Sequence, residues 1–244
     1  MPNDIITIVW KESKEFVQGS SKAGGIGRFV FPIVLAGILM PWRFGRAYVT
    51  GGAAFVGLVW ILPMIAVSLT VDAIAGERER HTLESLLATR LSDAAILFGK
   101  LTASVLYAWG MMIASLIVGV VTVNVTRRSG TLLLFSPAHA ATLVLFSLLS
   151  AILVCGIAVL LSVRAPTVRQ AAQTFGFGFT AIVFATIFGF QALPISWRNT
   201  LQQMVSGDQV VRTGTIAGLV FIALDVVVVA VARKRFQRAR LILD

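Results

Sequence analysis

Residues 138–163 read AHAATLVLFSLLSAILVCGIAVLLSV and contain no Asp, Glu, Lys or Arg. A helix needs about 20 apolar residues to cross the hydrocarbon of a bilayer, so this stretch predicts a membrane-spanning helix. Five further stretches are also long and predominantly apolar, namely residues 29–45, 53–73, 99–123, 171–193 and 213–231. The first of them is short and contains two prolines. The sequence therefore predicts an all-α membrane protein with six transmembrane helices.

The composition agrees with that class. Hydrophobic residues make up 57% of the 244 and charged residues only 13%, whereas soluble domains contain about 25% charged residues. A soluble fold of this length exposes too much surface to hide so much apolar material. The composition excludes a soluble enzyme and a nucleic-acid binder, although the net charge is +10.

The basic residues predict the orientation, because cytoplasmic loops of membrane proteins are enriched in Lys and Arg. Fifteen of the 21 basic residues precede the first predicted span, lie between the second and third or at the very start of the third, lie between the fourth and fifth, or follow the sixth. We therefore expect a multi-pass protein of the cell (plasma) membrane with both termini in the cytoplasm.

Residues 1–28 predict an amphipathic helix on the membrane surface and a flexible linker, followed by a transmembrane domain over residues 29–244. Apolar residues recur at helical spacing on one side, while charged residues occupy the other. The apolar set is Ile5, Ile6, Val9, Trp10, Phe16 and Val17, and the charged set is Lys11, Glu12, Lys14 and Glu15. A simple juxtamembrane anchor is the alternative interpretation.

The loop between the second and third predicted spans reads AGERERHTLESLLATRLS over residues 75–92. Leu83, Leu86, Leu87 and Leu91 have helical spacing, so a short helix with one apolar face is expected near residues 77–91. A dense cluster of mixed charge precedes them. A short stiff helix with a charged front is suited to docking a soluble partner.

Residues 75–100, AGERERHTLESLLATRLSDAAILFGK, resemble the signature of type-2 ABC permeases, the membrane subunits of ATP-driven transporters, mostly exporters. One difference is Arg90, where proline is common. The resemblance implies six spans preceded by an amphipathic elbow helix, with residues 77–90 as a coupling helix that meets an ATP-binding subunit. The implied partner-binding residues are Glu77, Arg78, Glu79, Arg80, His81 and Glu84. A second permease copy or a paralogue is implied as a further partner.

The chain contains no G-x-x-x-x-G-K-[ST] loop to hold nucleotide phosphates. It also shows no cluster of residues with metal-ligand spacing. We therefore expect a transport subunit that is not itself an enzyme and has no cofactor, with ATP and Mg bound by the partner subunit.

Two features inside the predicted spans are candidates for the transport path. Polar and aromatic residues of the fifth span fall near one line of a helix, where the side chains line either a substrate path or a helix–helix contact. These residues are Gln173, Phe177, Thr180, Phe184 and Gln191. Asp225 is the only acidic residue deep in a span and is either functional or structural. A proton- or ion-coupled carrier that uses Asp225 and a membrane scaffold without transport activity are the rival functions.

Overall fold

The computed structural model describes residues 2–19, 30–50, 53–82, 90–126, 131–197, 199–200 and 209–236. Every regular element in these ranges is a helix, which confirms the predicted all-α class. The elements are α1 (Pro2–Gly19), η1 (Ile33–Leu39), α3 (Met40–Phe44), α4 (Arg46–Thr50), α5 (Ala53–Glu79), α7 (Asp93–Thr126), α8 (Pro137–Ser162), α9 (Val168–Ala192) and α11 (Gln209–Arg235).

Four helices in the described ranges are long and apolar enough to cross a membrane: Asp93–Thr126, Pro137–Ser162, Val168–Ala192 and Thr215–Arg235. They coincide with the third to sixth predicted spans. The second predicted span falls within α5, a helix of 27 residues. The first coincides with the shorter apolar stretch Val30–Phe44. The protein is thus a multi-pass membrane protein, and the total of six spans stays a prediction.

The first predicted span is irregular, and its prolines and a glycine explain why. Its centre, η1, is a π-helix that follows Pro32, and Pro41 lies in the first turn of α3. Proline has no N–H to donate, so it is tolerated at a helix start and interrupts a continuous helix. Gly45 then adopts a positive φ of 55° between α3 and α4. Such a backbone favours glycine, and the helical path changes direction there.

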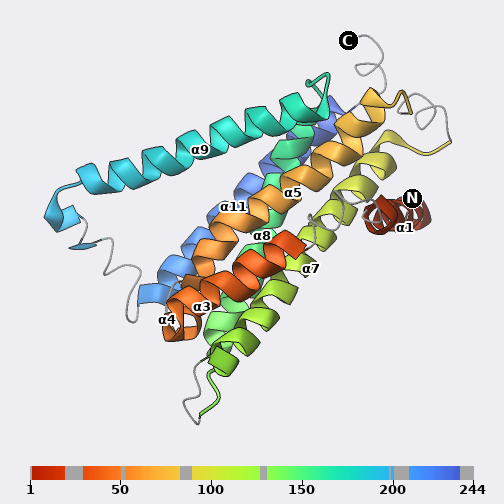
Figure 1. Ribbon diagram of the computed structural model, residues 1–244. Coiled ribbons are helices and arrows are strands. Elements are labelled where there is room, and N and C mark those ends of the chain that lie inside the picture. The colour runs from red at the N-terminus through yellow and green to blue at the C-terminus, as the bar shows by residue number, and fades with distance from the viewer. Residues whose placement is uncertain are drawn as a thin grey trace.

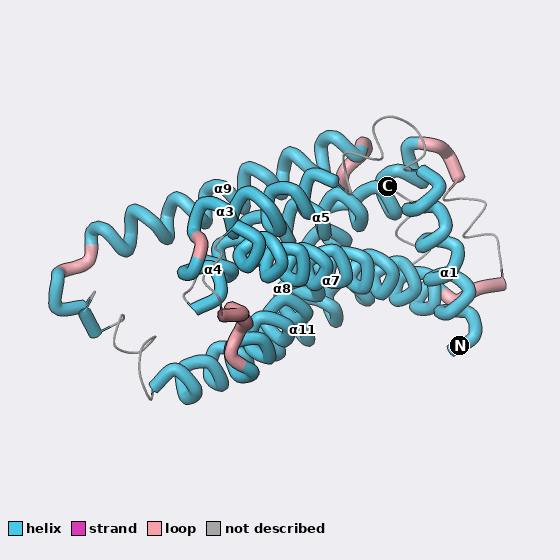
Figure 2. The backbone as a smooth tube through the Cα atoms, turned by 60° about the horizontal axis from the view of Figure 1, so that its bottom comes forward, coloured by secondary structure: helices cyan, strands magenta, loops and turns pink. Residues whose placement is uncertain are grey.

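The long helices form a bundle in which α8 packs against α5, α7 and α11 (Figures 1 and 2). The core between them contains fully buried aliphatic side chains, including Leu62, Leu69, Ile96 and Leu143. In Figure 1, α9 begins beside the bundle and then diverges from it. Only Ala171, near the start of α9, is buried in that helix.

Five helix termini meet at one end of the bundle, which we call the charged end: α5, α8 and α11 finish there, and α7 and α9 begin there (Figure 1). The N-terminal helix α1 lies at the same end and crosses α7 instead of running along it (Figures 1 and 2). Residues 2–19 are helical. The lipid-facing role of α1 stays a prediction, and the linker at residues 20–29 lies outside the described residues.

Candidate functional site: a buried charge cluster at the end of α5

Lys100 is the centre of the charged end. It lies about two helical turns into α7, and only 1% of its surface is exposed. Its Nζ lies 2.6 Å from Glu12 Oε1 of α1 and 2.9 Å from Glu77 Oε1 of α5, and it donates to the Ala73 carbonyl oxygen at 2.8 Å. Of its three N–H donors, two form hydrogen bonds, to Glu12 and to the Ala73 carbonyl, and Glu77 adds an ion pair. One side chain therefore links three helices.

Glu77 extends the cluster to a second lysine. Lys11 Nζ lies 3.2 Å from Glu77 Oε1, so this oxygen contacts two ammonium groups. Lys11 also contacts Glu15 at 3.3 Å at the exposed side of α1. The other carboxylate oxygen of Glu77, Oε2, is buried and has no hydrogen-bond partner among the described residues. In this cluster the negative charges of Glu12 and Glu77 are thus balanced by the positive charges of Lys100 and Lys11.

Burial changes the pKa of Glu12. Removal from water raises the pKa of the Glu12 carboxyl above its usual 4.5, and the attraction of Lys100 offsets this effect only in part. At Lys11, burial acts to lower the pKa. The carboxylates of Glu77, Glu15 and Glu12 outweigh it, so the Lys11 pKa lies above 10.5. The pKa values of Glu12 and Lys11 are therefore each influenced by the oppositely charged groups of the cluster.

Gly99 explains how α1 comes close enough for this contact. A Cβ atom at residue 99 would lie only 2.6 Å from Cβ and Cγ2 of Ile8, a distance that real side chains do not allow. Ile8 is buried against α7 at this point. The adjacent residues Gly99 and Lys100 therefore act together. Gly99 allows α1 to approach α7 closely, and Lys100 binds the Glu12 carboxylate of α1.

Arg78 and Glu79 connect the end of α5 to the α8–α9 connection. Arg78 donates from Nη2 to the Val163 carbonyl at 2.9 Å and from Nη1 to the Ala165 carbonyl at 3.4 Å. Glu79 Oε2 accepts from the Val168 N–H, the first residue of α9, at 3.2 Å. A cation at a helix C-terminus and an anion at a helix N-terminus are both favourable for the helix dipole. Both contacts thus stabilise this junction.

The last turn of α5 closes at His81. The Thr82 N–H donates to the Glu77 carbonyl at 2.9 Å, and the His81 N–H donates to the Arg78 carbonyl at 3.0 Å. His81 has a positive φ of 55°. This pair of bonds around a left-handed residue is the Schellman motif that ends many helices, usually with glycine at this position. The exposed Arg80 contacts only Asp72 of its own helix, at 3.2 Å.

Glu77, Arg78 and Glu79, three of the predicted partner-binding residues, form the last turn of α5 and make the contacts described above. His81 and Arg80 are exposed beyond it, and Glu84 lies outside the described residues together with most of the predicted coupling helix. That helix and its docking role stay predictions.

Lys100 was not predicted as a site residue, and Glu12 was predicted on the wrong side of α1. Glu12 was expected on the polar side of a surface helix, yet it is buried with 1% of its surface exposed. Trp10 and Ile6, expected on the membrane-facing side of that helix, are exposed at the protein surface, and their contact with lipid stays a prediction. The one signal in the sequence was Lys100 itself, a lysine two residues into a predicted apolar span. Such a residue needs a partner, but the sequence does not show which carboxylate supplies it.

The predicted substrate-path residues lie together along α9 but do not enclose a path within one chain. Gln173, Phe177, Thr180, Phe184 and Gln191 are all exposed, and 76% of the Phe177 surface is free. Phe175, by contrast, packs against the core and stacks on Phe179. The α9 stripe therefore faces away from the bundle, and its role stays a prediction.

Asp225 of α11 is buried, with 6% of its surface exposed. Neither of its carboxyl oxygens has a hydrogen-bond partner among the described residues. The described ranges also contain no group of three or more His, Cys, Asp or Glu side chains that could hold a metal ion.

Comparison with known proteins gives one match. The family model described as ABC-2 family transporter protein matches residues 11–241, nearly the whole chain. The match includes α5, α7 and all members of the charge cluster. A search of curated protein sequences finds no significant match.

Proposed function

The chain belongs to the ABC-2 family of transporter proteins, and from this premise we propose that it is the permease subunit of an ATP-driven exporter. A separate subunit would bind ATP and Mg and hydrolyse the nucleotide. The permease would convert the resulting movement into passage of a substrate across the membrane. The ATPase activity then belongs to the partner chain.

The observation that carries this proposal is the position of Glu77–Glu79. Glu77 contacts Lys100 of α7, which in turn contacts Glu12 of α1. Arg78 contacts the end of α8, and Glu79 contacts the start of α9. A partner that moves the segment after α5 therefore acts on four other helices at once. Charge-assisted hydrogen bonds of this kind are short and directional, which suits the transmission of a displacement.

The exposed face of α9 supports a second permease copy or a paralogue as a partner. Its long apolar residues, including Phe177, Ile182, Phe184 and Phe188, have little contact with the rest of the chain. In a bilayer, helices associate through packing and through polar groups such as Gln and Thr. A neighbouring copy would cover this face and place the α9 stripe at a shared path.

The charge distribution supports a plasma-membrane protein with its charged end in the cytoplasm. Most described basic residues, including those of α1 and the last turn of α11, lie at that end, whereas Arg43 and Arg46 lie at the other. Lys and Arg are enriched on the cytoplasmic side of membrane proteins. An ATP-binding subunit would meet the permease on the same side.

Reconstitution tests the proposal. We expect the chain, co-expressed with its ATP-binding partner, to form a complex that transports substrate only when ATP is present. Arg78→Gln should lower the amount transported per ATP hydrolysed while the complex still assembles. Arg164→Gln is the matched control, because Arg164 is exposed in the same junction and its side chain makes no hydrogen bond or ion pair with the described residues. Full transport in liposomes without ATP and partner would refute the proposal.

A proton- or ion-coupled carrier is the second candidate, and the buried Asp225 is the observation that favours it. A carboxyl group inside a membrane span is commonly part of a proton or ion path. Asp225 lacks a hydrogen-bond partner among the described residues, so it is available for such a role. Its substitution separates the two candidates, as described in the Discussion.

A further inference from the structure

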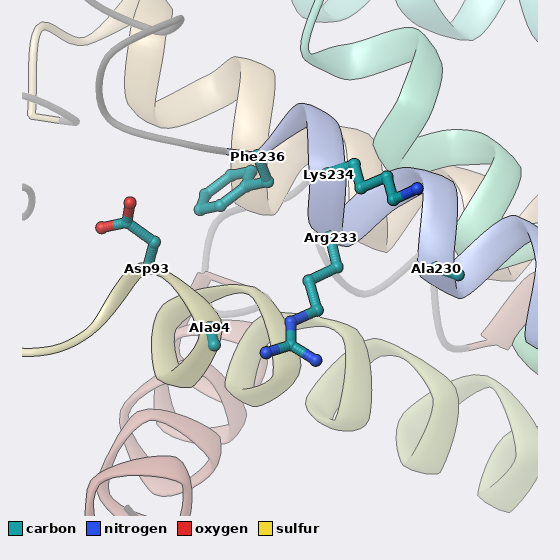
Figure 3. Close-up of a pocket in the computed structure, with 6 residues that line it drawn as sticks. All are labelled: Asp93, Ala94, Ala230, Arg233, Lys234 and Phe236. Atoms are coloured by element: carbon teal, nitrogen blue, oxygen red, sulfur yellow. The ribbon is translucent and has the colours of Figure 1, made fainter.

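A cavity of about 430 Å³ lies at the charged end, between the first turn of α7 and the last turns of α11. It is separate from the Lys100 cluster and shares no residue with it. Its lining consists of Asp93, Ala94, Ala230, Arg233, Lys234 and Phe236 (Figure 3). Two cations, one carboxylate, two alanines and one aromatic ring thus surround a space large enough for a polar headgroup.

The two cations of this cavity outnumber its one carboxylate, Asp93. Arg233 and Lys234 are exposed, and neither has an ion-pair partner within the described part of the chain. Figure 3 shows the Arg233 guanidinium beside Ala94, with the Asp93 carboxylate turned away from it. Lys234 extends from the other side of the helix end. The positive charge on this wall is therefore available to an anion.

The position of the cavity indicates where such an anion comes from. Both helices that form it are apolar enough to cross a membrane, and the cavity lies at their ends, where lipid headgroups are found. Away from the cavity, α11 exposes a continuous apolar surface that includes Val227, Val226 and Leu219. A molecule with a phosphate at one end and acyl chains at the other matches both parts of this surface.

We propose that the cavity binds the phosphate-bearing headgroup of an anionic phospholipid, with the acyl chains along the exposed side of α11. Basic pockets between membrane helices bind such headgroups, and each cation near the headgroup layer strengthens binding roughly fivefold. Free phosphate has the same charge chemistry. It lacks the chains, so it gains nothing from the apolar face of α11. The site would be the same whichever energy source drives transport.

The test uses the full chain, purified and delipidated in detergent, and titrated with dioleoyl phosphatidylglycerol, dioleoyl phosphatidylcholine or inorganic phosphate. Native mass spectrometry counts bound lipid, and the shift in Tm reports affinity. We expect phosphatidylglycerol to bind more tightly than phosphatidylcholine, and inorganic phosphate to produce no comparable shift. The double variant R233Q/K234Q should weaken phosphatidylglycerol binding by roughly 25-fold, since two cations are removed.

Two further variants separate this site from a general effect of charge. Arg235→Gln removes a cation from the same turn outside the cavity, and it should leave phosphatidylglycerol binding unchanged. Ala230→Trp keeps every charge but fills the cavity, and it should reduce lipid binding. The proposal is overturned if Arg235→Gln weakens binding as much as the double variant. It is also overturned if Ala230→Trp has no effect, or if inorganic phosphate alone reproduces the Tm shift.

Discussion

Lys100 shows how one buried residue organises a whole end of this protein. An ammonium group leaves water only when its donors find acceptors, because an unpaired buried charge is costly. For Lys100, Glu12 of α1 and the Ala73 carbonyl of α5 accept hydrogen bonds, and Glu77 of α5 adds an ion pair. The positions of α1 and α5 are therefore tied to one side chain of α7, and a change at this residue should be felt in all three helices.

Lys100→Met keeps the length and apolar stem of the side chain but removes the charge. Glu12 and Glu77 are then left buried without their shared cation, and breaking a buried pair in this way costs about 3 kcal/mol or more. We expect a marked fall in the Tm of the detergent-solubilised protein, by roughly 10 °C. Lys14→Met is the control, because Lys14 is exposed on α1 and lies only over the Trp10 ring. An equal effect of both variants would show that the buried cluster does not stabilise the fold.

At the scale of elements, the packing of α1 on α7 depends on a single absent side chain. Gly99→Ala should push α1 away, since the added Cβ would lie 2.6 Å from Ile8. We expect faster proteolytic cleavage within α1 and a lower Tm. Gly110→Ala, in the same helix, should leave both unchanged or raise the Tm slightly, because no atom lies within 4 Å of its added Cβ and alanine favours helix. Equal cleavage rates in the two variants would mean that α1 is not held at Gly99.

The two sides of α9 should respond differently to truncation of their aromatic residues. Phe175 packs against the core, so Phe175→Ala should lower the Tm, as truncation of a partly buried aromatic costs up to about 3 kcal/mol. Phe177 is exposed, so Phe177→Ala should leave the Tm unchanged and alter substrate-stimulated ATPase activity of the complex. Phe184→Ala should behave like Phe177→Ala. If none of the exposed-face variants changes the ATPase response, the α9 stripe contributes to packing between helices only.

At the scale of the whole molecule, Asp225 distinguishes an ATP-driven machine from a proton- or ion-coupled carrier. Asp225→Asn preserves shape and removes charge. An ATP-driven exporter obtains its work from the partner subunit, so we expect ATP-dependent uptake into inverted vesicles to persist with at most a modest loss. A proton-coupled carrier would lose gradient-driven uptake. If wild type responds to a pH gradient and not to ATP, and the asparagine variant abolishes that response, the ABC assignment of energy source is wrong.

Much of this protein follows from its sequence alone. Apolar length predicts spanning helices because a bilayer has a fixed thickness, and the four long apolar helices lie where that length placed them. The segment at residues 75–100 identified the family, and the comparison confirmed it. The two prolines of the first span are visible in the sequence and account for its irregular geometry. All of these depend on local properties of the chain, which are visible without knowing what lies beside them.

The arrangement of the charged end was decided only by tertiary structure. Amphipathic spacing placed Glu12 on the outer side of α1, since a carboxylate next to lysines ordinarily faces water. In the structure, Lys100 of α7 lies 88 positions further along the chain and provides a buried partner, so Glu12 turns inward and Trp10 remains exposed. Likewise, the sequence does not show that Glu77 and Arg78 contact Lys100 and a carbonyl at the end of α8, and their docking role stays a prediction. Whether a charge faces water or protein depends on which distant residue lies next to it, and local periodicity carries no information about that residue.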